Sequence, residues 1–272
     1  MSDQYRVVGN PIAHSRSPFI HQMFAAQTGQ DIEYQRQLIT DGHFEPDLDR
    51  FFAAGGCGVN VTLPYKQDAF RYAGQLSKAA RQAGAVNTLS RLESGIIAGD
   101  NTDGVGLVND ISGNLGWQIA GARVLLLGAG GAVRGVLGPV LDLKPAHVVI
   151  VNRTAAKATQ LATAFGEHGN IQALPVASVD GHFDLIINGT SASLSGDLLP
   201  VPATVIGSAT RAYDMAYADH PTVFLRWAEQ QGAVAVADGL GMLVEQAAES
   251  FRIWRSVKPD SRPVIEALRE SI

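Results

Sequence analysis

A lysine stands just beyond one of the predicted strands, at a position where its side chain could take part in chemistry. Residues 58–62, "GVNVT", read as a strand, Pro64 ends it, and Lys66 begins the next element. In α/β folds the carboxyl ends of strands usually carry the ligand-binding groups. A lysine held by a carboxylate can protonate a forming alkoxide, and Asp103 is the candidate partner. A solvated surface lysine is the alternative, so this interpretation depends on further polar residues.

Two amides are further candidates for binding a polar substrate. Asn87 lies in the otherwise apolar segment "AVNT". Gln246 follows Met242 by one helical turn on the predicted last helix, and the two could border a cleft. Gln246 could equally be solvated. Lys66 and Asp103 are far apart in the chain, so the sequence alone does not show that they meet.

Two serines lie at the start of a predicted helix, in "HSRSP". Ser17 alone is explained as the helix N-cap, with Pro18 at the first helical position and Gly29 just past the end. Ser15 adds a second hydroxyl two residues earlier. Two hydroxyls and the N–H groups at the positive end of a helix would suit a carboxylate.

A glycine-rich loop follows a strand and precedes a helix in "RVLLLGAGGAVRG". Gly128, Gly130 and Gly131 allow a tight turn and let backbone N–H groups reach a pyrophosphate at the helix N-terminus. Their spacing departs from the G-x-G-x-x-G pattern, so an ordinary tight turn competes with this interpretation. The next strand, "HVVIV", comes at the distance expected of a dinucleotide-binding unit.

The residues after that next strand favour NADP(H) over NAD. An NAD enzyme usually has an acid there for the ribose, but this chain has Asn152, Arg153 and Thr154. Arg153 could pair with a 2′-phosphate and stack on adenine, and Lys157 adds charge one helical turn later. The alternative is that Arg153 is a solvated loop residue.

Strands and helices alternate along the chain, which is typical of α/β folds. After Gly121 the apolar runs "ARVLLLG", "AHVVIVN", "FDLIING" and "RAYDMAY" have little polar alternation, as in parallel strands that are covered on both faces. We therefore place a domain boundary near residue 102. A final helix is predicted over "GMLVEQAAESFRIW".

The composition narrows the class of protein. Hydrophobic residues make up 46% and charged residues 17% of the 272, as in a globular protein with a large core. The net charge of −5 and the lack of a dense basic run argue against a nucleic-acid partner. One cysteine, Cys57, excludes a disulfide framework and a cysteine-based metal site. Neither a signal peptide nor an apolar run of the ~20 residues of a spanning helix is visible, so a cytoplasmic location without a membrane partner is expected.

Several separate segments together carry a family resemblance. They are "NPIAHSRSP", "NVTLPYK", "GAVNTL", "GDNTDG", "LLLGAGGA", "VNRT" and "DGLGMLVEQAA", and they span nearly the whole chain. In this order and spacing they closely resemble the shikimate dehydrogenase family. The resemblance implies reversible, NADPH-dependent reduction of 3-dehydroshikimate to shikimate, in the biosynthesis of chorismate and aromatic amino acids. No metal is implied.

The resemblance also implies the architecture. The expected fold class is α/β with two domains, an N-terminal α/β substrate domain and a Rossmann-like NADP-binding domain. The C-terminal helices are expected to return to the first domain, and the catalytic site to lie in the cleft between the two. The expected domains are residues 1–102 with 238–272, and residues 103–237.

Site residues follow from the same resemblance. It implies that Lys66, paired with Asp103, is the acid/base. The substrate residues would be Ser15 and Ser17 for the carboxylate and, around the ring hydroxyls, Thr62, Asn87, Asp103, Tyr217 and Gln246. The cofactor residues would be Gly128, Ala129, Gly130, Gly131, Ala132, Asn152, Arg153, Thr154, Lys157, Thr190, Met215, Gly239 and Met242. Lysine at position 157, where the family often has arginine, would weaken the grip on the 2′-phosphate without reversing the preference.

Alternatives remain open. One is an enzyme of the same superfamily that also, or mainly, oxidises quinate, often with NAD; such an NAD-using relative would be expected to show an acid near position 153. Another is an NADP-binding sensor without catalysis, which the presence of both Lys66 and Asp103 disfavours. The sequence does not specify the oligomeric state, and a homodimer is one possibility.

Overall fold

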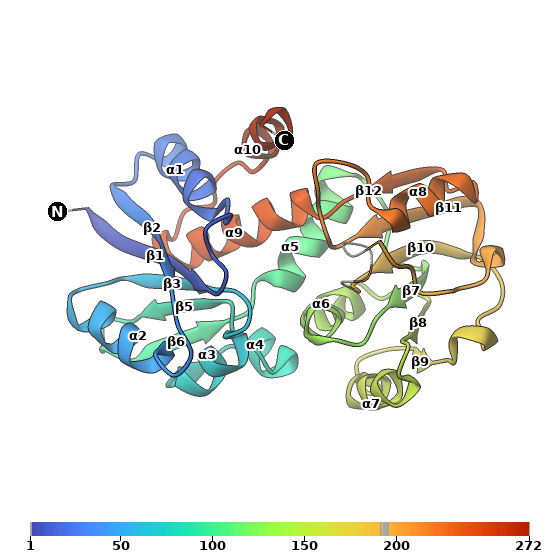
Figure 1. The fold of residues 1–272 in the computed structure, drawn as a ribbon, viewed down its shortest axis with the longest axis horizontal. Helices are drawn as coiled ribbons and strands as arrows, with labels where there is room; N and C mark the ends of the chain where they lie inside the picture. The colour runs from blue at the N-terminus through green and yellow to red at the C-terminus, as the bar shows by residue number, and fades with distance from the viewer. Residues whose placement is uncertain (1, 191, 193–195, 272) are drawn as a thin grey trace. The chain divides into compact units, whose positions relative to one another are not determined.

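The computed structural model describes residues 2–190, 192 and 196–271 (Figure 1). The chain forms two compact units, the first Met1–Gly106 with Val244–Glu270 and the second Leu107–Leu243 with Ser271–Ile272. The chain passes between them inside two helices, α5 (Asp103–Asn109) and α9 (Leu240–Arg255). Both passages come a few residues after the predicted limits of the central domain, 103 and 237, because each lies inside a helix that begins at or after the predicted limit.

The first unit is built on a six-stranded mixed sheet in the described residues. The strand order is β2-β1-β3-β5-β6-β4, and β5 is antiparallel to both of its neighbours. The strands are β1 (Asp3–Gly9), β2 (Ile32–Leu38), β3 (Gly58–Val61), β4 (Gln75–Leu76), β5 (Thr88–Arg91) and β6 (Ile97–Asp100). The helices that belong wholly to this unit are α1 (Ser17–Thr28), α2 (Phe44–Ala53), α3 (Lys66–Tyr72), α4 (Lys78–Ala83) and α10 (Arg262–Glu270).

Both faces of this sheet are packed. Residues of α2 and α3 form one apolar cluster with Val8, Val59 and Val61. On the other face Tyr5, Val7 and Tyr34 pack with residues of α1 and α9. Burial on both faces explains why all four residues of β3 are buried, including its polar Asn60.

The predicted start of α1 needs a correction. Ser17 is not the N-cap, because Arg16 has that position and Ser17 is the first helical residue. No side chain caps the helix start. Pro18 does lie in the first turn, and Gly29 ends the helix in the left-handed conformation, with φ 64°. The Ser17 hydroxyl is therefore not used as a helix cap.

The second unit has a six-stranded, all-parallel sheet in the described residues, in the order β12-β11-β10-β7-β8-β9. The strands are β7 (Arg123–Leu127), β8 (His147–Val151), β9 (Ile171–Ala173), β10 (Phe183–Asn188), β11 (Ile206–Asp214) and β12 (Ala235–Ala237). The helices are α6 (Gly131–Asp142), α7 (Ala155–Phe165) and α8 (Val223–Gln230), with a π turn (Asp110–Asn114) and short 3₁₀ turns (Val176–Ser178 and Ala203–Val205).

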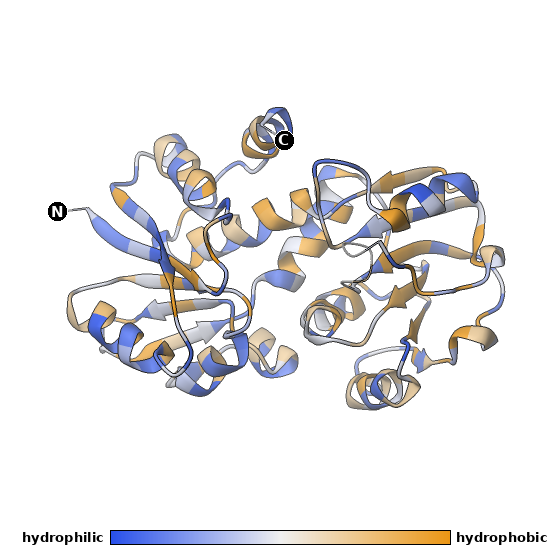
Figure 2. Ribbon diagram, viewed as in Figure 1, coloured by the Kyte–Doolittle hydropathy of each residue, from blue (hydrophilic) through white to orange (hydrophobic). Residues whose placement is uncertain are grey.

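Helices cover both faces of this parallel sheet, which confirms the predicted Rossmann-like fold. Helices α6 and α7 pack on the face that carries Val124 and Leu126, and α8 packs on the face with Leu125 and Leu127. The central strands are accordingly hydrophobic along their length (Figure 2). The short edge strands β9 and β12, with only three residues each, were not predicted, since so short a run carries no periodicity.

Gly241, near the start of α9, lies against a buried carboxylate in the second unit. A Cβ atom on Gly241 would come within 2.0 Å of Oδ1 of Asp110. Asp110 cannot move aside easily, because the Tyr213 hydroxyl donates to its Oδ2 at 2.6 Å and Asn114 donates to its Oδ1 at 2.9 Å. Only glycine fits at this position of the helix.

Gly241→Ala is therefore expected to destabilise the protein by roughly 2–3 kcal/mol, because overpacking and a disturbed buried hydrogen-bond network add together. Thermal unfolding followed by circular dichroism measures the effect. Gly113→Ala is the matched control, since a Cβ on Gly113 would have no atom within 4 Å. A midpoint that stays at the wild-type value for Gly241→Ala would contradict the packing argument.

Candidate active site

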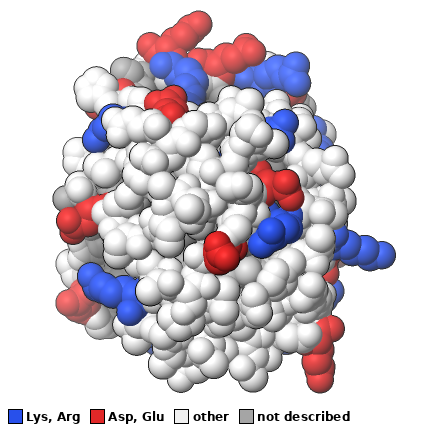
Figure 3. Space-filling view, turned by 90° about the vertical axis from the view of Figure 1, so that its right-hand side faces the viewer, with Lys and Arg blue, Asp and Glu red and all other residues white. Residues whose placement is uncertain are grey.

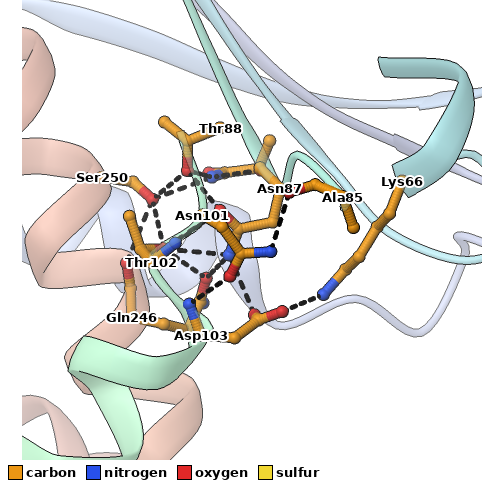
Figure 4. Close-up of polar contacts among 10 residues, drawn as sticks. Lys66, Ala85, Asn87, Thr88, Asn101, Thr102, Asp103, Gln246 and Ser250 are labelled. Carbon is orange, nitrogen blue, oxygen red and sulfur yellow. Dashed lines mark hydrogen bonds and ion pairs between the residues drawn. The ribbon is translucent and has the colours of Figure 1, made fainter. Parts of the chain in front are cut away.

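Lys66 and Asp103 meet in the first unit. Nζ of Lys66 donates to Oδ2 of Asp103 at 2.5 Å, an ion pair between side chains that are 27% and 14% exposed (Figure 4). Lys66 is the first residue of α3 and Asp103 the first of α5. The backbone fixes Lys66 as well, because its carbonyl accepts from the N–H of Val86 at 2.9 Å. Both side chains are partly exposed to solvent, which leaves the ion pair accessible to a substrate.

Asn87 holds the other oxygen of this carboxylate. Its Nδ2 lies 2.9 Å from Oδ1 of Asp103 and 3.3 Å from Oε1 of Gln246. Its Oδ1 accepts from the backbone N–H of Thr102 at 2.9 Å. The structure thus brings four of the predicted site residues together, Lys66, Asn87, Asp103 and Gln246. The resulting cluster carries one cation, one anion and two amides.

A second layer of polar side chains lies behind this cluster, and sequence analysis assigned it no role in the site. Asn101 accepts from the N–H of Asp103 at 3.1 Å and donates to the carbonyl of Ala85 at 3.0 Å. Ser250 donates to the carbonyl of Gln246 at 3.0 Å. Asn101 and Thr102 lie in the segment "GDNTDG" directly before Asp103. Their polar side chains at this position were the one feature of the sequence that could have indicated a role in the site.

Asn60, left without a role by its sequence pattern, connects this layer to β2. Its Nδ2 lies 3.0 Å from Oγ of Ser250 and 3.2 Å from the carbonyl of Asn87. Its Oδ1 accepts from the hydroxyl of Tyr34 at 2.7 Å. The amide is buried, and all of these contacts are to protein groups. A polar residue in an otherwise apolar strand is explained by this set of partners.

The two serines contact each other at the start of α1. Oγ of Ser15 donates to Oγ of Ser17 at 3.1 Å and accepts from the N–H of Ser17 at 3.3 Å. Burial raises the pKa of Tyr34 well above its usual value, and the side chain of Ser17 opposes that shift. A chain of polar groups runs from the hydroxyl of Tyr34 through the Asn60 amide to the carbonyl of Asn87.

Thr62 and Tyr217 are the two remaining predicted substrate residues. Thr62 follows β3, is half-buried, and donates its backbone N–H to the carbonyl of Val8 at 2.9 Å. Tyr217 follows β11 and belongs to the second unit, whereas the other predicted substrate residues belong to the first. Their assignment to the substrate stays a prediction.

The glycine loop of the second unit has the geometry that a pyrophosphate requires. Gly128 adopts φ 108°, which only glycine takes without strain, directly after β7. Helix α6 begins at Gly131, and no side chain caps its start. A Cβ on Gly130 or Gly131 would meet no atom within 4 Å, so open space lies over the amides of the first turn. Ala129 and Ala132 complete the loop with small side chains. The residues present therefore fit a dinucleotide phosphate group.

Cationic side chains follow the next strand, β8. Arg153 and Lys157 are exposed, and neither forms an ion pair or a side-chain hydrogen bond with a described residue. Asn152 donates to the carbonyl of Thr154 at 2.9 Å, which fixes the turn before α7. The two cations are therefore available to a phosphate. On the face in Figure 3, charged side chains of both signs are scattered among uncharged residues.

Four further predicted cofactor residues lie at the ends of β10 and β11 and around the start of α9. The Thr190 hydroxyl donates to Oδ1 of Asn188 at 2.8 Å, and the N–H of Met215 donates to the carbonyl of Asn188 at 2.9 Å. A Cβ on Gly239 would lie 2.2 Å from the carbonyl oxygen of Met215, so the two segments touch through their backbones. Met242 is only 9% exposed and packs against the core of the second unit, and its assignment to the cofactor stays a prediction.

Three protein-family models match separate parts of this chain. Residues 7–89 match the shikimate dehydrogenase substrate binding domain, residues 110–195 match shikimate / quinate 5-dehydrogenase, and residues 239–269 match the shikimate 5'-dehydrogenase C-terminal domain. A protein of Cellvibrio japonicus named shikimate dehydrogenase (NADP(+)) is 56% identical over 273 residues, which covers 100% of this chain and 99% of that protein. The chain belongs to the shikimate dehydrogenase family.

Solved structures agree with this family membership. The crystal structure of an Ael1 enzyme from Pseudomonas putida is 46% identical, with a TM-score of 0.95 and 98% of each chain covered. Shikimate 5-dehydrogenase from Thermus thermophilus, solved in complex with NADP(H) and shikimate, is 31% identical with a TM-score of 0.88. It covers 99% of this chain and 100% of its own. The likeness extends over both units of the fold.

Two kinds of feature are absent from the described residues. No helix there is both long and apolar enough to cross a membrane. No group of three or more His, Cys, Asp and Glu side chains in that part of the chain could hold a metal ion.

Proposed function

We propose that this chain catalyses the reversible reduction of 3-dehydroshikimate to shikimate with NADPH, in the biosynthesis of chorismate and aromatic amino acids. The observation that carries this proposal is the Lys66–Asp103 ion pair, held by Asn87 beside Gln246 in a member of the shikimate dehydrogenase family. The reaction converts 3-dehydroshikimate, NADPH and one proton into shikimate and NADP⁺. Bound NADPH supplies the hydride to the C3 carbonyl.

Lys66 is the acid/base in this proposal. In the direction of reduction its ammonium group donates a proton to the carbonyl oxygen of the substrate. In the reverse direction the neutral amine accepts the proton of the hydroxyl. Asp103 orients Lys66 through their ion pair, while Asn87 keeps the carboxylate in place through Oδ1. Such acid–base help is typically worth about 10²–10⁴ in rate.

Substrate and cofactor are assigned to separate units. The first unit, with Ser15 and Ser17 for the carboxylate and with Asn87 and Gln246 for ring hydroxyls, is the substrate domain, which the matched substrate binding domain supports. The second unit is the NADP domain, where the loop from Gly128 to Ala132 holds the pyrophosphate. Asn152, Arg153, Thr154 and Lys157 hold the 2′-phosphate and its surroundings. A cytoplasmic location is part of the same proposal.

A direct assay tests the function. Purified protein is mixed with NADP⁺ and shikimate, and the absorbance of NADPH is followed. We expect turnover with this pair and little with quinate and NAD⁺, because Arg153 stands where an NAD enzyme usually has an acid. Turnover only with quinate and NAD⁺ would reassign the substrate, and no turnover with either pair would favour an NADP-binding sensor. Light scattering on the same sample distinguishes a monomer from a homodimer.

A further inference from the structure

Arg36 on β2 contacts the serine pair, although its sequence pattern indicated no role. Its Nε and Nη2 both donate to the carbonyl oxygen of Ser15, at 2.8 and 2.5 Å. The same turn is fixed from within, since the N–H of Ser15 donates to the carbonyl of Ile12 at 3.1 Å. The two-pronged contact fixes the direction of the planar guanidinium as well as its position.

Strand β2 contacts the serine turn and the helix that follows it. Tyr34 and Arg36 are two residues apart on β2, so their side chains leave the strand on the same side. The ring of Tyr34 is stacked on that of His21, one turn along α1 from Ser17, with 4.2 Å between centroids. Arg36 holds Ser15 by its carbonyl. The turn that carries Ser15 and the first turns of α1 are therefore both held against β2.

The charge of Arg36 is not neutralised by the protein. No carboxylate among the described residues forms an ion pair with it, and its side chain is exposed. Other arginines of this unit do have carboxylate partners, namely Arg50, Arg71, Arg252 and Arg255. The contact with Ser15 uses two of the five N–H groups of a guanidinium, which leaves donors for a further acceptor.

Two neutral hydroxyls and a helix N-terminus offer only partial charges to a carboxylate, whereas a guanidinium offers a full one. We propose that Arg36 determines specificity for the anionic group of the substrate: it positions Ser15 and places a full positive charge beside the Ser15–Ser17 pair. This proposal rests on the assignment of that pair to the substrate carboxylate.

The test compares Arg36→Gln with Arg36→Lys in shikimate oxidation at saturating NADP⁺. Glutamine can still donate to the Ser15 carbonyl but has no charge, while lysine keeps the charge without the two-pronged contact. We expect Arg36→Gln to raise the KM for shikimate about tenfold, with kcat within about twofold, and Arg36→Lys to recover about half of that loss on a logarithmic scale. The KM for NADP⁺ should not change.

The dependence of the shikimate KM on salt concentration distinguishes an electrostatic role of Arg36 from a purely structural one. Between about 0.05 and 0.5 M salt the wild-type KM for shikimate should rise, because screening weakens the attraction, and the KM of Arg36→Gln should rise much less. Arg91→Gln is the matched control: Arg91 is an exposed arginine of the same unit that donates to a backbone carbonyl, that of Gly55, at 3.3 Å. It should leave KM and its salt dependence unchanged.

Three outcomes would overturn the proposal. They are an unchanged shikimate KM in Arg36→Gln, a parallel rise in the KM for NADP⁺, and the same salt dependence in the variant and the wild type. Any of these in an enzyme that oxidises shikimate leaves the proposed function standing and removes only the role of Arg36. A wild-type chain that does not turn over shikimate would remove both.

Discussion

Lys66→Ala is expected to lower kcat for shikimate oxidation by about 10²–10⁴, while the Kd for shikimate changes less than about threefold. The reason is that the variant loses the group that exchanges the proton but keeps the groups that hold the ring. Asp103 retains its hydrogen bond from Asn87 at 2.9 Å, so the carboxylate stays in place when its cation is removed. Steady-state kinetics and calorimetric titration with shikimate measure the two quantities separately.

Lys258→Ala is the control for this experiment. Lys258 is an exposed lysine of the same unit, and no described residue forms an ion pair or side-chain hydrogen bond with it. Its replacement should leave both constants at the wild-type values. Equal losses of rate and binding in Lys66→Ala would assign Lys66 to substrate binding instead of proton transfer. A fully active variant would exclude it from the chemistry.

Arg153→Ala is expected to raise the KM for NADP⁺ by about 10–100-fold, because a hydrogen bond to a charged group contributes roughly 1.5–3 kcal/mol. The KM for NAD⁺, which lacks the 2′-phosphate, should change less than about threefold. The remaining Lys157 lies one turn along α7 and keeps part of the attraction, so the preference for NADP⁺ should weaken without reversing.

Kinetics with both cofactors at saturating shikimate measure this difference. Arg226→Ala is the matched control, since Arg226 is an exposed arginine of α8 in the same unit, where its guanidinium contacts the carbonyl of Pro221. That variant should leave both KM values unchanged. If Arg153→Ala shifts the two values by the same factor, the assignment of Arg153 to the 2′-phosphate is wrong.

The start of helix α1 at Ser17 could not be predicted from the local sequence. A serine before a proline is a good N-cap by propensity, yet Arg16 is the cap residue and the Ser17 hydroxyl accepts from the Ser15 hydroxyl instead. Propensity did not decide the helix start, because a cap contributes only ~1 kcal/mol. The contact of Arg36 with Ser15 could not be predicted for a related reason. The alternation of buried and exposed residues along β2 does not show which exposed side chain will reach a turn elsewhere in the chain.

The sequence by itself determined the α/β class, the parallel sheet of the second unit and the family, because apolar runs, glycines at strand ends and ordered motifs are local properties of the chain. It also supplied Lys66 as the candidate acid/base and Asp103 as its candidate partner. Only the tertiary structure decided that the two side chains meet at 2.5 Å, that Asn87 joins them to Gln246, and that Arg36 holds Ser15. These contacts join residues distant in the chain, and the strand order of the sheet sets them: β1 lies between β2 and β3 and brings Tyr34 and Asn60 to the same face.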